Sequence, residues 1–203
     1  MSRTGILGGS FNPPHVGHLV GARCAAEQLG LQRVLLVPLA EPAHRALDGD
    51  PGAGARLELC ELAVEGDPLL EACDVEVARG GTSYTVDTLE QLRGEGVADP
   101  VLILGADAAL GLAGWREPGR VLELSSLAVA PREGSEGAGE VARQVQEAFP
   151  GARVEPFAMP LIGISSSLLR SRLAAGLAIR DMVPAAVEER ILAGGWYGAG
   201  GGA

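Results

Sequence analysis

Hydrophobic residues along the chain fall into short continuous runs separated by longer amphipathic stretches. Four short runs are continuously apolar, at residues 4–11, 33–38, 102–106 and 127–131. Such runs are typical of strands that are buried on both faces of a parallel sheet. Apolar residues recur at helical spacing in the stretches between them, at 16–30, 55–65, 85–94 and 138–148. This alternation of strand and helix predicts a doubly wound, Rossmann-like α/β fold with a parallel sheet.

The remaining stretches have other patterns. Polar and apolar residues alternate at 71–78, which predicts an edge strand or a half-exposed strand. From residue 164 onward the pattern is wholly helical, and we expect a small helical C-terminal part at about 164–195. The glycine-rich tail at 198–203 is predicted to be disordered, and the loop-like segment 46–55 is a candidate flap. Because the chain shows no internal repeat, we expect a single domain over 1–203.

The composition is that of a globular protein, and it excludes several classes of function. Of the 203 residues, 47% are hydrophobic and 21% are charged. All 16 basic residues are arginines, so the chain lacks the lysine of a Walker-type phosphate loop and the lysine of Schiff-base chemistry. The net charge of −10 argues against nucleic acid as a partner. An anionic ligand must therefore be held by local arginines and histidines.

Cysteine spacing and hydropathy bear on the location of the protein. Cys24, Cys60 and Cys73 lie far apart without C-x-x-C spacing, which favours neither a disulfide framework nor a zinc site. No apolar run approaches the roughly 20 residues needed to span a bilayer, and the first residues lack the apolar core of a signal peptide. We therefore expect no membrane partner and a cytoplasmic location.

The stretch GGSFNPPHVGH, residues 8–18, contains two of the three histidines of the chain. Pro14 suits the first position of a helix, which places His15 and His18 on one face of its first turns. Glycines keep side chains away, so that a ligand can approach the backbone, and Ser10 adds a hydroxyl. A helix N-terminus with two imidazoles at the carboxyl end of a strand predicts a phosphate site. The alternative is an ordinary strand-to-helix turn with incidental histidines.

This stretch resembles the signature of the nucleotidyltransferase superfamily, in which two histidines are spaced H-x-G-H and Ser or Thr stands at the position of Ser10. The resemblance implies a second half of the signature, a hydroxyl-rich helix start followed by arginine. The segment ISSSLLR at 164–170 supplies it. Ser165 or Ser166 would cap the helix and present a hydroxyl, and Arg170 lies on the same face as Ser166. A guanidinium matches phosphate oxygens in a bidentate way, whereas the alternative for the serines is simple capping.

The length and further segments resemble the bacterial nicotinate-nucleotide adenylyltransferase family over nearly the whole chain. The segment VPLAEPAHR is similar to that family's V-P-x-x-x-P-P-H-K/R motif, with Ala43 in place of the second proline. Three further segments match in kind: GTSYTVDTL at 81–89, GADAALGLAGW at 105–115 and VPAAVEERILAGGWY at 183–197. Arg190 and Trp196 stand where the family usually has tyrosine and leucine, which we interpret as a departure of packing only.

The resemblance implies a reaction. ATP would transfer its adenylyl group to nicotinate mononucleotide, which gives nicotinate adenine dinucleotide and pyrophosphate in NAD biosynthesis. The attacking phosphate is already ionised at neutral pH, so the reaction needs positioning and charge stabilisation in place of a general base. Bound phosphates should favour the protonated forms of the histidines. Mg²⁺ would be carried by the phosphates of ATP, with no metal site built by the protein.

We predict the following site residues. The catalytic residues are His15, His18 and Arg170. The ATP-binding residues are Gly8, Gly9, Ser10, Phe11, His15, His18, Gly105, Asp107, Ile164, Ser165, Ser166 and Arg170. The substrate-binding residues are Asn12, His44, Arg45, Thr85, Trp115 and Arg132. Purely structural alternatives remain for residues in two of the segments: Asp107 as a helix N-cap, Trp115 as part of the core, and capping of a helix by Ser83 or Thr85.

Other functions also remain open. Transferases of the same fold accept nicotinamide mononucleotide or phosphopantetheine as the second substrate. A class I tRNA synthetase fragment shares the histidine pair but would need a lysine that the chain lacks. Another alternative is a module that senses ATP without turnover. The presence of His15, His18 and Arg170 argues against it. A homo-oligomer is compatible with the sequence.

Overall fold

Six strands form one sheet in the part of the chain that the computed structural model describes, residues 3–43, 46–131 and 137–199. The strands are β1 (Arg3–Gly9), β2 (Arg33–Pro38), β3 (Leu70–Ala72), β4 (Asp99–Leu104), β5 (Ser126–Val129) and β6 (Val154–Pro156). Their order is β3-β2-β1-β4-β5-β6, and the pairings β1–β4, β4–β5 and β5–β6 are parallel. Because β1 and β4 are neighbours, the order reverses between them, as in a doubly wound sheet. The predicted fold class is therefore confirmed.

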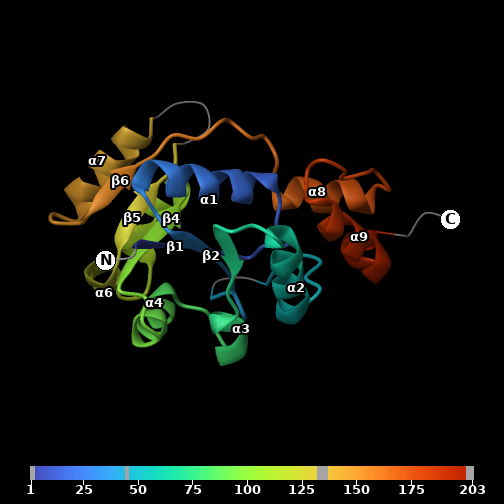
Figure 1. Ribbon diagram of the computed structural model, residues 1–203, viewed down its shortest axis with the longest axis horizontal. Coiled ribbons are helices and arrows are strands. Elements are labelled where there is room, and N and C mark those ends of the chain that lie inside the picture. The colour runs from blue at the N-terminus through green and yellow to red at the C-terminus, as the bar shows by residue number, and fades with distance from the viewer. Residues whose placement is uncertain (1–2, 44–45, 132–136, 200–203) are drawn as a thin grey trace. The chain divides into compact units, whose positions relative to one another are not determined.

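Helices connect the strands (Figure 1). They are α1 (Val16–Leu29), α2 (Ala53–Val64), α3 (Val75–Arg79), α4 (Thr85–Gly94), α5 (Ala106–Leu110), α6 (Pro118–Leu124), α7 (Ala138–Ala148), α8 (Ser166–Ala174) and α9 (Ala185–Gly194). Two short 3-10 helices are η1 (Leu112–Gly114) and η2 (Trp196–Gly198). No helix within the described residues is long and apolar enough to cross a membrane.

The internal contacts of the chain divide it into two compact units. Unit 1 consists of Met1–Gly8, Val20–Leu35 and Tyr84–Leu161. Unit 2 consists of Gly9–Leu19, Leu36–Ser83 and Ile162–Ala203. A single domain over 1–203 stays a prediction.

Unit 1 contains the central strands, with α1 and α7 on one side of them and α4 and α6 on the other (Figure 1). β5 is buried along its whole length, as its continuous apolar run predicts. β1 approaches its neighbours closely at Gly5, where a Cβ atom would come within 2.9–3.0 Å of the side chains of Leu31, Val34 and Ile103. Glycine at this position therefore permits the close packing of β1 in the core.

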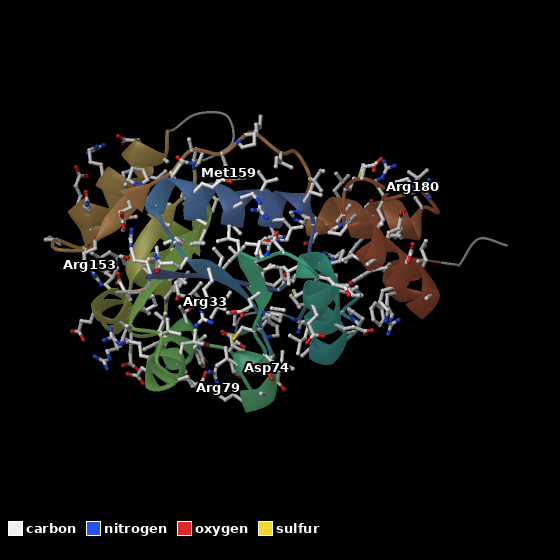
Figure 2. All side chains as sticks on the ribbon, in the orientation of Figure 1. Arg33, Asp74, Arg79, Arg153, Met159 and Arg180 are labelled. Carbon is white, nitrogen blue, oxygen red and sulfur yellow. The ribbon has the colours of Figure 1, made fainter. Side chains whose placement is uncertain are left out.

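The segment after β6 lies along α1 in unit 1. The amide of Gln28 accepts a hydrogen bond from the backbone N–H of Ala158 at 2.9 Å and donates one to the Ala158 carbonyl at 2.7 Å. Met159, which Figure 2 shows beside α1, packs within 3.7 Å of the position that a Cβ of Gly21 would take. These contacts hold the segment after β6 against α1.

Unit 2 has an apolar core that joins α2 to the C-terminal helices. The buried residues of this core are Leu59, Leu169, Leu173, Ile179, Val183, Val187, Ile191, Tyr197 and Ala199. α8 and α9 are the helices that the pattern after residue 164 predicts. Residues 198–199 differ from the predicted disordered tail, because Gly198 ends η2 and Ala199 is buried in this core. Residues 200–203 lie outside the described residues.

Arg190 and Trp196 contact each other in unit 2. The guanidinium of Arg190 lies 4.2 Å from the centre of the Trp196 ring, and its Nε donates to Glu58 of α2 at 2.6 Å. The side chains at the two positions that depart from the family pattern therefore form one stacked pair, which also ties α9 to α2.

The strand predicted at 71–78 is wrong over most of its length. β3 ends at Ala72, and a helix of five residues, α3, begins at Val75. A helix of little more than one turn is too short to show a period of 3.6 residues, and the polar residues Asp74 and Glu76 alternate with Val75 and Val77 as they would in a strand. Gly80, with a φ of +69°, ends the helix. The sequence pattern also gave no prediction of β6, α5 or α6, which are three to seven residues long.

Candidate active site

The loop between β1 and α1 carries the histidine motif, and we call residues 9–18 the histidine loop. Phe11 has a left-handed φ of +45° and is buried, and the Asn12–Pro13 peptide bond is cis. A Cβ on Gly9 would lie 3.4 Å from the Phe11 ring. α1 begins at Val16, so the helix starts two residues later than Pro14 predicts. His15 precedes the helix, and its carbonyl oxygen accepts the backbone N–H of His18 at 2.9 Å.

The two imidazoles stack on each other in unit 2. Their ring centres are 3.8 Å apart with an angle of 32° between the ring planes. A Cβ on Gly17 would come within 3.0 Å of the His15 ring, so glycine between the histidines permits this arrangement. The backbone N–H of His15 donates to Nδ1 of His18 at 3.2 Å. Because Nδ1 is the acceptor, the proton of a neutral His18 lies on Nε2, which is left as a donor.

Burial favours the neutral form of both histidines. It lowers the pKa of His15 to about 4. Burial and the neighbouring His15 lower the pKa of His18 to about 3. Nδ1 of His15 is buried and has no hydrogen-bond partner among the described residues. The prediction that bound phosphates favour protonated histidines concerns the complex and stays a prediction.

The first turns of α8 contact the histidine loop directly. Ser165 is the N-cap, and its hydroxyl accepts the backbone N–H of Leu168 at 3.2 Å. The Ser166 hydroxyl donates to the Pro13 carbonyl at 2.8 Å. Arg170 donates from Nη1 to the Asn12 carbonyl at 2.9 Å. The two motifs, about 150 residues apart in the sequence, therefore lie together in unit 2.

A pocket of about 140 Å³ lies where these segments meet. It is lined by Ser10, Asn12, Ala46, Leu47, Asp48, Ser165, Ser166, Ser167 and Arg170. The segment 46–48 is held there by Asn12, whose Nδ2 donates to the Asp48 carbonyl at 3.0 Å. The segment that is predicted to be a flap therefore forms a wall of this pocket.

The pocket offers cationic and N–H groups to an anion. Of the carboxylates in the described part of the chain, none forms an ion pair with Arg170. Arg170 uses Nη1 for a carbonyl and Nη2 for the Ser167 hydroxyl at 3.4 Å, and its charge is left for a ligand. The backbone N–H groups of the first turn of α8 add the positive end of a helix dipole. This set of groups is suited to phosphate oxygens.

The other predicted residues of these segments are not among the residues that line this pocket. Gly9, Phe11, His15, His18 and Ile164 belong to unit 2. Gly8 belongs to unit 1, and a Cβ at this position would meet no atom within 4 Å.

Besides Gly8, four predicted residues within the described part of the chain lie in unit 1. Gly105 is the N-cap of α5, and no side chain caps this helix. The alternative in which Asp107 is the N-cap is therefore wrong. Asp107 is exposed in the first turn of α5. Thr85 begins α4 after Tyr84, and neither Ser83 nor Thr85 caps this helix with its side chain. Trp115 is only partly buried, so it is not a fully enclosed core residue.

Arg116 contacts the start of α4 within unit 1. Its guanidinium lies 4.7 Å from the centre of the Tyr84 ring and 3.5 Å from Asp87. His44, Arg45 and Arg132, which are also predicted to bind substrate, lie outside the described residues.

The sequence reasoning missed Arg56, whose side chain is fully buried in unit 2 beside the pocket walls. Its guanidinium donates to the carbonyl of Ser10 and to the carboxylate of Asp50. The only signal in the sequence is an arginine within the apolar pattern of 55–65, which a long exposed side chain also explains.

Comparisons with known proteins identify the family of the chain. A family model described as cytidylyltransferase-like matches residues 6–172. A probable nicotinate-nucleotide adenylyltransferase of Thermomicrobium roseum is 41% identical, over 97% of this chain and 92% of the relative. A protein of the same description from Salinibacter ruber is 39% identical, over 92% of this chain and 93% of the relative.

A solved structure shares the fold. The Plasmodium falciparum nicotinic acid mononucleotide adenylyltransferase complexed with NaAD has a TM-score of 0.76 at 16% identity, over 98% of each chain. The present chain therefore belongs to the cytidylyltransferase-like family and is a nucleotidyltransferase. The relatives that it matches over nearly their full length are probable nicotinate-nucleotide adenylyltransferases.

Proposed function

We propose that this nucleotidyltransferase joins ATP to nicotinate mononucleotide and forms nicotinate adenine dinucleotide and pyrophosphate, a step of NAD biosynthesis. The observation that carries the proposal is the pocket of unit 2, in which the histidine loop meets the N-terminus of α8. Its hydroxyl, guanidinium and N–H groups suit a polyphosphate. The full-length relatives, which bear the name of this activity, support the choice of substrates.

The chemistry requires no general base. A phosphate oxygen of nicotinate mononucleotide attacks the α-phosphorus of ATP, and the bond from that phosphorus to the β-phosphate bridging oxygen breaks. Since the attacking phosphate is already ionised, the enzyme must bring two anions into line and stabilise the charge that develops on pyrophosphate.

The hydrogen bonds of three predicted residues support a role for each of them. His18 would donate from Nε2 to a phosphate oxygen, because its Nδ1 is used by the backbone N–H of His15. Arg170 would bind the departing pyrophosphate with those of its guanidinium N–H groups that do not donate to the Asn12 carbonyl. The hydroxyl of Ser166 already donates to Pro13, so it would act by holding α8 against the histidine loop.

The second substrate and the metal follow the predictions from the sequence. Thr85 and Trp115 would contact the pyridine nucleotide, through backbone N–H groups at the start of α4 and through the partly exposed indole ring. Mg²⁺ would arrive on ATP and neutralise phosphate charge. The pocket lining has one carboxylate, that of Asp48, which suits an ion held mainly by phosphate oxygens. A cytoplasmic location and a homo-oligomer stay predictions.

A pyrophosphate-release assay tests the proposal. The purified protein is given ATP and Mg²⁺ with nicotinate mononucleotide, nicotinamide mononucleotide or phosphopantetheine, each over a range of concentrations. We expect kcat/KM to be highest with nicotinate mononucleotide and the product to be the dinucleotide. A higher kcat/KM with either other acceptor would reassign the substrate, and ATP binding without turnover on any of them would favour a sensing module.

A further inference from the structure

Arg56, in the first turn of α2, has a side chain with no exposed surface. Its Nε donates to Oδ1 of Asp50 at 2.9 Å, and its Nη2 donates to the carbonyl of Ala40 at 3.0 Å. Its Nη1 donates to the carbonyls of Leu39 at 2.7 Å and Ser10 at 3.0 Å. Burying a guanidinium is costly even when it is paired, and an apolar side chain of similar size would often serve stability as well. The buried charge is therefore better explained by what it holds in place.

The partners of Arg56 belong to separate segments of the pocket walls. Ser10 lines the pocket and precedes the left-handed residue Phe11 in the histidine loop. Asp50 follows the lining segment 46–48, and its Oδ1 also accepts the backbone N–H of Gly52 at 2.9 Å. One planar group thus connects the histidine loop, the end of β2 and the segment 46–50.

We infer that Arg56 is a positioning residue, which fixes the spacing between the histidine loop and the segment 46–50 and so preorganises the pocket for the triphosphate of ATP. The inference rests on the proposed function. A guanidinium presents N–H groups in fixed directions in one plane, so it can hold several oxygens at set positions. Lysine would keep the charge but lose this geometry, because its donors are on a single nitrogen.

Two variants and a matched control separate positioning from stability. Asp50→Ala releases the segment 46–50 while the carbonyl contacts of Arg56 stay, and Arg56→Lys loosens all of them. The control is Arg190→Met, which removes another arginine bonded to α2, through Glu58, away from the pocket lining. Each kinetic constant is measured at a temperature where circular dichroism shows the variant folded.

We expect Asp50→Ala to raise the KM for ATP about tenfold with little change in kcat, as for the loss of one charge-assisted hydrogen bond. Asp50→Asn should recover much of this, because the amide oxygen still accepts from Arg56. Arg56→Lys should lower kcat/KM for ATP about 100-fold, since positioning errors cost that much. Arg190→Met should leave both constants unchanged and lower only Tm.

Wild-type kinetics in both Asp50→Ala and Arg56→Lys, with only Tm reduced, would overturn the inference. If Arg56→Lys does not fold, the comparison of Asp50→Ala with Asp50→Asn decides it, and an unchanged KM in Asp50→Ala overturns it. Absence of dinucleotide formation by the wild-type protein would refute the proposed function instead. A titration with a fluorescent ATP analogue then still tests the positioning, since equal Kd values for wild type and Asp50→Ala would refute it.

Discussion

Replacing His18 by asparagine tests whether Nε2 of this imidazole acts on the phosphates. The Asn amide oxygen takes the place of Nδ1, so it can still accept the His15 N–H that lies 3.2 Å from Nδ1 in the structure. The asparagine side chain is shorter and places no group at the position of Nε2. His18→Ala removes both functions, and His18→Gln brings an amide N–H back toward the Nε2 position.

The loss of turnover and the loss of stability can each be given a magnitude. Loss of one donor to developing charge lowers kcat by roughly 10²–10³, and we expect this for both His18→Asn and His18→Ala. His18→Ala also leaves the partly buried His15 N–H without its acceptor, which costs about 1 kcal/mol in the free energy of unfolding. The alanine variant additionally loses packing on the Phe11 ring, whose centre lies 4.9 Å from that of His18. The asparagine variant should therefore be the more stable of two equally impaired enzymes.

Pyrophosphate release with saturating substrates gives kcat, and urea unfolding gives the stability of each variant. We expect His18→Gln to recover part of the lost kcat. Turnover of His18→Asn within threefold of wild type would show that Nε2 does not carry the proposed role. Equal stability of the asparagine and alanine variants would contradict the assignment of Nδ1 as a structural acceptor.

Three further predictions concern pH, the acceptor substrate and packing. Burial lowers the pKa of His15 from 6.5 to about 4. At a pH between these two values, the His15 imidazole is therefore protonated in the unfolded chain and neutral in the folded chain. The free energy of unfolding should therefore fall as pH falls, by about 2 kcal/mol from His15 between about pH 7 and pH 5, and the same pH slope in His15→Asn during urea unfolding would contradict this. Trp115→Ala should raise the KM for nicotinate mononucleotide about tenfold and leave that for ATP unchanged, whereas equal effects on both would favour a packing role. Arg190→Met and Trp196→Leu should each lower Tm, and the double variant should lose less than the sum, because the two side chains stack; a strictly additive loss in thermal unfolding would refute the coupling.

The hydrophobic pattern by itself determined the fold class. β4 and β5 are buried on both faces, so their sequences are continuously apolar and can be recognised without any knowledge of their neighbours. α3 escaped prediction because five residues carry no helical period. The histidine motif and the serine-rich helix start are local patterns too, which is why the sequence indicated both halves of the candidate site.

Only the tertiary structure decided how these groups are used. The acceptor role of His18 Nδ1, the bond from Ser166 to Pro13 and the burial of Arg56 each depend on partners brought close by folding. A hydroxyl or guanidinium has the same sequence letter whether it faces water, a carbonyl or a ligand. Hydrogen bonding and burial are properties of three-dimensional surroundings, and the chain specifies them only through the folded state as a whole.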